Sequence, residues 1–271
     1  MMFAISCLLV CVLTWTGHVY GQTNTCEAFI DLTLIIDSSG SVAPADFEEG
    51  KKALLDLTSR LNVGPEKAGV AILNFASDVS LSAQTDVFEF ERIQLMNEIA
   101  ALPRLGTNTA TGTALTVAKS YCDARCRPIA KAIPRIFAIF TDGHSNEGPP
   151  AIPAAEAIRA SPIEGTIFAV GIGNIGVDGN AELLGLAGDP DYVMNINSYL
   201  DLAKVTNAIT MKMCDFPAFV LPNVPILGEA TGNNTRYYRM HTLNKINKNA
   251  FFEVELTDRA GQVSESRRTM K

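Results

Sequence analysis

Histidine, basic charge and long apolar runs are scarce in this chain of 271 residues. Beyond the N-terminal stretch only His144 and His241 remain, so the serines of the Ser39/Ser41 motif described below have no evident base for nucleophilic catalysis. The net charge is −7, and no basic patch interleaved with aromatics appears, which argues against nucleic-acid binding. After residue 21 no run is long and apolar enough to cross a bilayer, so we expect no membrane span.

Residues 1–21 predict a secretory signal peptide. An apolar core at 3–13 is followed by small residues at the cleavage positions, around Val19-Tyr20-Gly21. No Lys or Arg precedes the core, and an uncleaved membrane anchor is the alternative. The run is short for a span, and the polar pair Gly17-His18 follows it, which favours cleavage. We therefore expect a secreted protein.

Four cysteines remain after the signal: Cys26, Cys122, Cys126 and Cys214. An even number in an exported protein predicts disulfides, and four cysteines allow three pairings. We expect Cys26–Cys214, because these two bracket the α/β region, and closing so long a loop contributes about 4–5 kcal/mol in the entropy model. Cys122 and Cys126 then pair locally. A zinc site is disfavoured, since there is no second cysteine pair and no nearby histidine.

Between residues 28 and 214 apolar strands alternate with amphipathic helices. This alternation predicts an α/β fold with a doubly wound, mainly parallel sheet flanked by helices. The expected strands are 29–36, 68–75, 79–81 (an edge strand in a hairpin), 135–140, 166–172 and 192–195. The expected helices are 46–61, 90–102, 110–121, 153–160, 181–187 and 199–213.

Residues 215–271 differ in composition from the rest. Prolines punctuate a linker, residues 250–256 alternate as a strand does, and residues 258–261 resemble a turn. Residues 215–271 contain too few apolar residues to form more than a marginal hydrophobic core of their own. We expect a small C-terminal β-hairpin or a partly disordered tail, exposed enough for the sequon at Asn233 to be glycosylated.

The first expected strand ends in Asp37-Ser38-Ser39-Gly40-Ser41. Asp37, Ser39 and Ser41 alternate, so their oxygens point the same way, and Gly40 allows a tight turn. Oxygen ligands at the carboxyl end of a buried strand suit Mg²⁺, Mn²⁺ or Ca²⁺ rather than zinc or copper. On its own the motif is weak, because Asp and Ser also cap strands and helices through local hydrogen bonds.

Two further stretches carry oxygen side chains that could join the same site. Thr107 lies in a hydroxyl-rich loop at 106–112 before a helix, and Asp142 follows the strand 135–140. Because the carboxyl ends of parallel strands share one edge of a sheet, these residues can converge with Asp37, Ser39 and Ser41.

This three-part pattern resembles the metal-ion-dependent adhesion site of von Willebrand factor type A domains, also called integrin I-type domains. The similarity extends beyond the site to residues 70–75, 169–173 and 182–190, and covers about residues 28–213. It implies a domain at 26–214 between the outer cysteines, which recur outside such domains in extracellular members.

The resemblance also implies a function. A divalent cation, Mg²⁺ or else Mn²⁺ or Ca²⁺, would be held by Asp37, Ser39, Ser41, Thr107 and Asp142, with the two carboxylates acting mainly through water. A Glu or Asp of an extracellular protein, collagen-like or another matrix protein, would complete the coordination. Ser38, Asn108 and His144 would form the rim that contacts this partner. The expectation is a non-enzymatic adhesion module of the extracellular matrix.

Three alternatives remain. The stretch 171–176 fits the glycine pattern of dinucleotide-binding folds, but Val177-Asp178-Gly179 intervenes before the helix and Ile196 stands where a ribose needs an acid. Asp37 and Asp142 could form a hydrolytic pair, although both serve a metal better. A structural matrix protein, mineral- or polysaccharide-associated, could use the metal for stability alone.

Overall fold

A computed structural model describes residues 29–65, 67–81, 91–128, 131–160, 162–214, 218–219, 238–239, 251–257 and 263–269. Six strands form one sheet in the order β3-β2-β1-β4-β5-β6. All neighbours are parallel except β3, which pairs antiparallel with β2 at one edge. The strands are β1 (Asp31–Asp37), β2 (Gly69–Phe75), β3 (Val79–Leu81), β4 (Arg135–Thr141), β5 (Thr166–Ile172) and β6 (Val193–Ile196).

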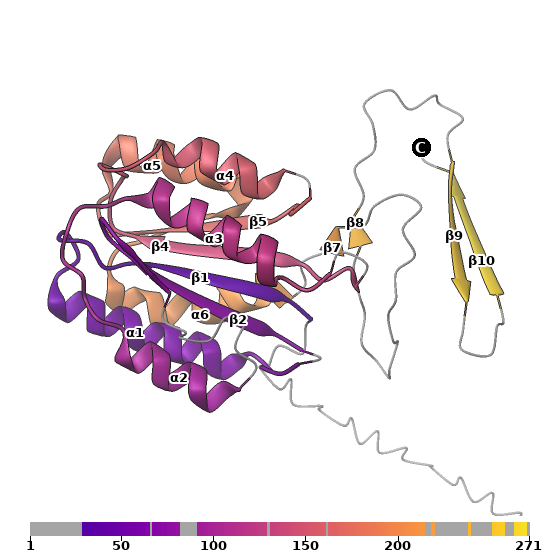
Figure 1. Cartoon of the computed structure of the whole chain (residues 1–271), viewed down its shortest axis with the longest axis horizontal. Coiled ribbons are helices and arrows are strands. Elements are labelled where there is room, and N and C mark those ends of the chain that lie inside the picture. Colours follow the sequence, from indigo (N-terminus) through magenta and orange to yellow (C-terminus); the bar gives the residue numbers. More distant parts are fainter. Residues whose placement is uncertain are drawn as a thin grey trace, which may run out of the picture.

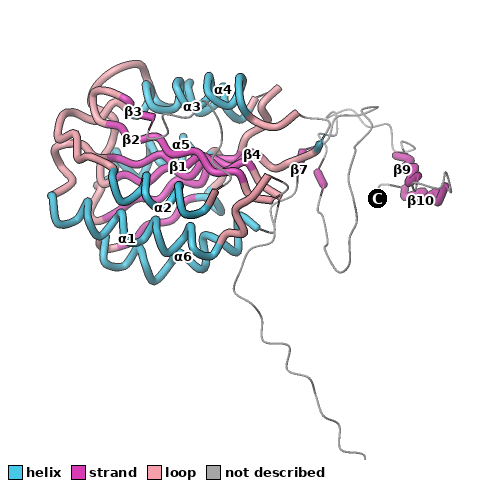
Figure 2. The backbone as a smooth tube through the Cα atoms, turned by 60° about the horizontal axis from the view of Figure 1, so that its bottom comes forward, coloured by secondary structure: helices cyan, strands magenta, loops and turns pink. Residues whose placement is uncertain are grey.

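Helices cover both faces of this sheet, which confirms the predicted doubly wound α/β fold. Figure 1 shows α3, α4 and α5 on one face and α1, α2 and α6 on the other, and the rotated view in Figure 2 keeps this arrangement. The helices are α1 (Pro44–Arg60), α2 (Arg92–Ala101), α3 (Thr111–Arg125), α4 (Ala151–Arg159), α5 (Gly176–Ala187) and α6 (Tyr199–Cys214), with a 3₁₀ turn η2 (Pro190–Tyr192).

The central strand β1 is buried along its whole length. Its successive side chains point to opposite faces, so Leu32 and Leu34 pack into the layer of α1, α2 and α6. Ile35 packs into the second layer, with α3, α4 and α5. A strand with apolar neighbours on both sides needs an unbroken apolar run, which is the pattern that predicted it.

The predicted start of α5 was wrong. The sequence favoured a helix over 181–187, whereas α5 begins at Gly176. Val177-Asp178-Gly179 was expected to precede the helix, but Gly179 is buried within it, and a Cβ there would lie 2.9 Å from the Ile175 side chain. Close packing of the first turn, rather than a break in the helix, requires that glycine.

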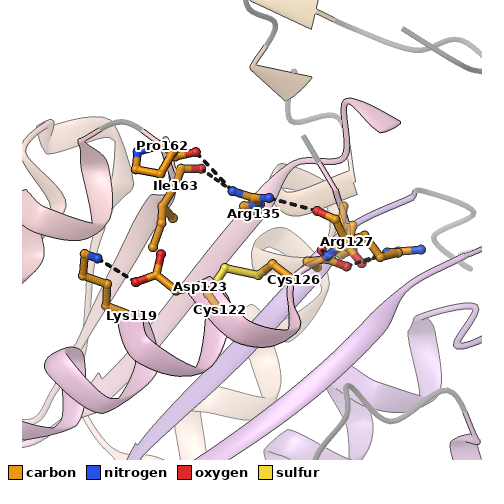
Figure 3. The surroundings of a disulfide bond; sticks show 10 residues. Lys119, Cys122, Asp123, Cys126, Arg127, Arg135, Pro162 and Ile163 are labelled. Carbon is orange, nitrogen blue, oxygen red and sulfur yellow. Dashed lines mark hydrogen bonds and ion pairs between the residues drawn. A yellow bond between two sulfur atoms is a disulfide. The ribbon is translucent and has the colours of Figure 1, made fainter. Parts of the chain in front are cut away.

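The amino ends of β1 and β4 carry a partly buried polar cluster beside a disulfide (Figure 3). Cys122 and Cys126 are bonded to each other at the end of α3. The next residue, Arg127, pairs with Asp31 of β1 at 2.6 Å, and Arg135 of β4 donates to the Arg127 carbonyl at 2.9 Å. This cluster fastens the segment after α3 to the sheet.

The C-terminal residues contain two short strand pairs. β7 (Ala218–Phe219) lies parallel to β8 (Tyr238–Arg239), and β9 (Phe251–Thr257) pairs antiparallel with β10 (Val263–Thr269). β9 corresponds to the strand expected at 250–256. The signal at 1–21, Cys26 and Asn233 lie outside the described residues, so the signal, the Cys26–Cys214 bond and the glycosylation stay predictions.

Within the described ranges, no helix combines the length and the apolar character that spanning a membrane requires.

Candidate metal centre

The structure brings four of the five predicted ligands into one hydrogen-bonded chain. Asp37 ends β1, and Asp142 directly follows the neighbouring strand β4. The Oγ atoms of Ser39 and Ser41 lie 3.0 Å apart, and Ser41 Oγ donates to Asp142 Oδ1 at 2.7 Å. Parallel pairing of β1 and β4 therefore places the two carboxylates at the same edge of the sheet.

Asp37 is fixed from two sides. Its Oδ1 accepts from the backbone N–H of Ser39 at 2.8 Å, and its Oδ2 accepts from the Thr141 hydroxyl at 2.6 Å. Asp37 and Thr141 are each 1 % exposed. Sequence reasoning missed Thr141, although it stands directly before Asp142 in the Thr-Asp-Gly triplet that marked the end of this strand.

The loop that carries Thr107 lies against the Asp37 motif through its backbone. Gly40 N–H donates to the Thr107 carbonyl at 2.6 Å, and Gly106 N–H donates to the Ser38 carbonyl at 2.8 Å. The Thr107 hydroxyl accepts from Ser77 N–H at 3.0 Å, so it faces Ser77 rather than joining the hydrogen-bonded chain of the other four. It is exposed and keeps a lone pair for a ligand.

The loop after β4 is bound to the Thr107 loop. Thr109 N–H donates to Asn146 Oδ1 at 2.9 Å, and the Thr109 carbonyl accepts from Asn146 N–H at 2.9 Å. Nearby, Gly112 at the start of α3 lies so close to Pro149 that a Cβ would meet its carbonyl oxygen at 2.0 Å. The three segments of the site thus hold one another in place.

The predicted rim needs one correction. Asn108 and His144 are exposed at the surface, as a contact role requires. Ser38 is 0 % exposed, and its hydroxyl donates to the Phe75 carbonyl at 3.1 Å. Its prediction as a rim residue was wrong: the alternation that turns Asp37, Ser39 and Ser41 to the site turns Ser38 into the protein.

The electrostatics of the site suit a cation. Burial is the main cause that raises the pKa of Asp37, and the charge of Asp142 adds to it. Burial also raises the pKa of Asp142, with a further contribution from Asp46. Hydrogen bonds from Thr141 and Ser39 to Asp37, and from Ser41 to Asp142, lower these pKa values in part. One buried and one partly buried carboxylate, together with three hydroxyls, form a hard-oxygen set that fits Mg²⁺, Mn²⁺ or Ca²⁺.

The described part of the chain contains no group of three or more His, Cys, Asp or Glu side chains able to hold a metal. The Asp37–Asp142 site falls outside that criterion, because three of its five predicted ligands are the hydroxyls of Ser39, Ser41 and Thr107.

The raised pKa values predict how the metal-free protein responds to pH. Both carboxyls bind protons more tightly in the folded state than in the unfolded chain, where their ordinary pKa is 3.8. The resulting stabilisation is full below pH 3.8 and is lost as pH rises through the folded-state pKa values. We expect the urea midpoint of chelator-treated wild type to fall as pH rises above 3.8. The midpoint of Asp37→Asn, which lacks one of the two titrating carboxyls, should fall less over the same range. Equal slopes would contradict the assignment.

Comparison with known proteins identifies the fold family. A sequence model of the von Willebrand factor type A domain matches residues 31–208. Human collagen alpha-1(XXI) chain is 30 % identical over 206 residues, which are 75 % of this chain and 20 % of the collagen. Mouse matrilin-2 is 28 % identical over 205 residues, 73 % of this chain and 21 % of matrilin-2. The chain thus spans about a fifth of these relatives.

Solved structures agree on the fold. Proximal thread matrix protein 1 from the mussel byssus superposes with a TM-score of 0.62 at 22 % identity, over 70 % of this chain and 49 % of the mussel protein. Another structure of that protein is described as having a zinc-occupied metal-ion-dependent adhesion motif. A von Willebrand factor type A protein from Catenulispora acidiphila gives 0.58 at 20 % identity, over 69 % and 43 % of the two chains.

The collagen and matrilin relatives are secreted matrix proteins rather than enzymes, and the predicted secreted, extracellular-matrix location is confirmed. The match over residues 31–208, the doubly wound sheet and the oxygen cluster at its carboxyl edge agree with one another. This chain belongs to the von Willebrand factor type A domain family.

Proposed function

We propose that the domain is a non-enzymatic adhesion module that binds an extracellular protein through a divalent cation. Asp37, Ser39, Ser41, Thr107 and Asp142 hold the cation, and a Glu or Asp carboxylate of the partner completes its coordination. The cation supplies an electrophilic position for that carboxylate, and Asn108 and His144 contact the partner beside it.

One observation carries this proposal: the hydrogen-bonded chain from Ser39 to Asp142 starts beside a buried carboxylate and passes through Ser41, which is exposed. Asp37 is enclosed, whereas Ser41 and Thr107 are exposed. A cation on these residues would be fixed from the protein side and accessible from solvent. A cation that served stability alone would need no such accessible side.

The donor set favours Mg²⁺, Mn²⁺ or Ca²⁺, because carboxylate and hydroxyl oxygens are hard ligands. The mussel protein, whose adhesion motif is described as zinc-occupied, shows that zinc should be tested as well. We take collagens and matrilins as the first candidate partners to test, because this chain resembles parts of such matrix proteins and one matrix protein can join another.

Calorimetric titration of each cation into chelator-stripped protein tests the metal site. We expect saturable binding in the wild type and its loss, at least a hundredfold, in Asp37→Ala and Thr107→Ala. Asp123→Ala is the matched control, because it removes a carboxylate that pairs with Lys119 on α3 and takes no part in the site. No binding to the wild type would overturn the proposal, and equal loss in Asp123→Ala would point to bulk charge.

Binding to immobilised collagen and matrilin tests the adhesion step. We expect binding in Mg²⁺ that disappears with chelator and in Asp37→Ala. Chemical amidation of the partner's carboxyl groups should abolish it too. Cation binding with no cation-dependent partner binding would favour the alternative, a structural matrix protein in which the metal only stabilises the domain.

A further inference from the structure

Arg104 stands before the loop that carries the predicted threonine ligand, and its side chain reaches across to the turn at residues 39–42. Its Nε donates to the Val42 carbonyl at 2.6 Å, and a terminal nitrogen donates to the Gly40 carbonyl at 3.0 Å. The same nitrogen lies 3.4 Å from the Ser39 carbonyl, which is a longer and weaker contact. One guanidinium therefore contacts three backbone carbonyls of a single turn.

The guanidinium of Arg104 lies where two ligand-bearing segments meet. A Cβ on Gly106 would lie 3.0 Å from a terminal nitrogen of Arg104, so the side chain rests against the loop as well as the turn. The backbones are joined at the same place, because Gly106 N–H donates to the Ser38 carbonyl at 2.8 Å and Gly40 N–H donates to the Thr107 carbonyl at 2.6 Å. Arg104 thus adds a side-chain clamp to this backbone contact.

A clamp on these carbonyls acts on the predicted ligands. The turn at residues 39–42 carries Ser39 and Ser41, whose hydroxyls point wherever its backbone directs them. Hydrogen bonds from a charged donor are stronger than those between neutral groups, and several of them on one turn restrict its backbone. A turn that is ordered before the cation arrives leaves less conformational entropy to be lost on binding.

The charge of Arg104 has the opposite effect on cation binding. A guanidinium keeps its proton at any working pH, and it repels a cation held beside it. If charge alone mattered, removing Arg104 would tighten cation binding. Salt screens this repulsion between partly exposed groups, whereas it leaves the short contacts to the carbonyls largely intact. We therefore expect the ordering of the turn to outweigh the repulsion.

We propose that Arg104 is a positioning residue of the cation site, whose guanidinium fixes the turn of Ser39 and Ser41 against the loop of Thr107. This inference rests on the proposed function, because it concerns the same cation. It predicts that a positive side chain beside the site strengthens the binding of a positive ion.

Calorimetric Mg²⁺ titration of Arg104→Met and Arg159→Met in the full chain tests the proposal. Arg159 is the matched control, because it is also partly buried and donates to two consecutive carbonyls, those of Gly185, at 3.1 Å, and Leu186. It ends α4, which leads from the site edge of the sheet to the amino end of β5, so it lies away from the site. We expect affinity to fall about tenfold in Arg104→Met and to stay unchanged in Arg159→Met.

Arg104→Lys separates position from charge. Lysine keeps the positive charge but lacks the planar fork that bonds several carbonyls at once. We expect its affinity to lie between those of the wild type and Arg104→Met. Tighter or unchanged binding in Arg104→Met would overturn the inference, and so would an equal loss in Arg159→Met. If Arg104→Met does not fold, Arg104→Lys carries the test, and an affinity equal to that of the wild type would overturn the inference.

Amide hydrogen exchange followed by NMR gives a local readout that general destabilisation would not reproduce. In cation-free Arg104→Met the amides of Gly40 and Gly106 should exchange faster than in the wild type, and saturating Mg²⁺ should slow them again. Arg159→Met should leave both amides as they are in the wild type. Wild-type exchange in Arg104→Met would contradict the clamp. A wild type that binds no cation would instead overturn the proposed function.

Discussion

Replacing Arg127 by Met should lower the free energy of unfolding by about 3–5 kcal/mol, because the buried Asp31 carboxylate loses its ion pair and keeps only the backbone N–H of residue 127 as a donor, at 2.8 Å. The Asp31 side chain is 0 % exposed and that of Arg127 is 10 % exposed. Arg127 Nε donates to Asp31 Oδ1 at 2.6 Å, and a terminal nitrogen donates to the Ile30 carbonyl at 2.7 Å. The substitution removes both bonds in a place that water reaches poorly.

Urea unfolding of Arg127→Met beside Lys119→Met checks this result. Lys119 pairs with Asp123 four residues along α3, with both side chains partly in water, so its loss should cost at most about 0.5 kcal/mol. Adding Asp31→Leu to Arg127→Met should recover part of the stability, since it removes the stranded charge. If Arg127→Met lowered the free energy of unfolding no more than Lys119→Met does, the Asp31–Arg127 pair would not be a major source of stability at the amino ends of β1 and β4.

Replacing Gly112 by Ala should destabilise the domain by about 3 kcal/mol or more, at the upper end of overpacking effects. The added Cβ would lie 2.0 Å from the Pro149 carbonyl oxygen and 2.9 Å from its carbon. Both are backbone atoms, so no side-chain rotation relieves the contact. The segment around Pro149 or the start of α3 must move, and the loop of Thr107 directly precedes that helix. We therefore expect weaker cation binding as well.

Gly64→Ala is the matched control. A Cβ at Gly64 meets only the flexible Lys67 side chain, at 3.8 Å. Its effect should stay within about 1 kcal/mol, because a tolerated Gly-to-Ala change mainly restricts the unfolded chain. Thermal unfolding and calorimetric Mg²⁺ titration of both variants give the two readouts. A stable Gly112→Ala protein with wild-type affinity would show that the close approach to Pro149 is not required.

The convergence of the site was predictable because it follows from topology. Asp37 and Asp142 end neighbouring parallel strands, and parallel strands align their carboxyl ends whatever fills the rest of the chain. The serines at alternate positions after Asp37 also converge predictably, because they need only a tight turn at Gly40 to bring their hydroxyls to the same side. The four central strands β1, β2, β4 and β5 were predictable because strands buried on both faces are continuous apolar runs.

What the sequence did not reveal depends on contacts between distant residues. Ser38 is turned inward by its bond to the Phe75 carbonyl, and Thr107 is turned toward Ser77. Neither partner is a neighbour in sequence. Gly179 is a different case: its contact with Ile175 is local, but the intrinsic preference of glycine argues against a helix there, so its place inside α5 was not predicted.

The central place of β1 has a consequence for how the chain acquires its structure. Leu34 of β1 pairs with Ile72 and with Ala138, which lie 38 and 104 residues later. During synthesis the strand that ends in Asp37 emerges first, yet it can complete its pairing only after β4 has emerged. Such long-range pairing slows folding and leaves an apolar strand exposed meanwhile. The segment that anchors the adhesion site is thus also the one most in need of protection from aggregation in the nascent chain.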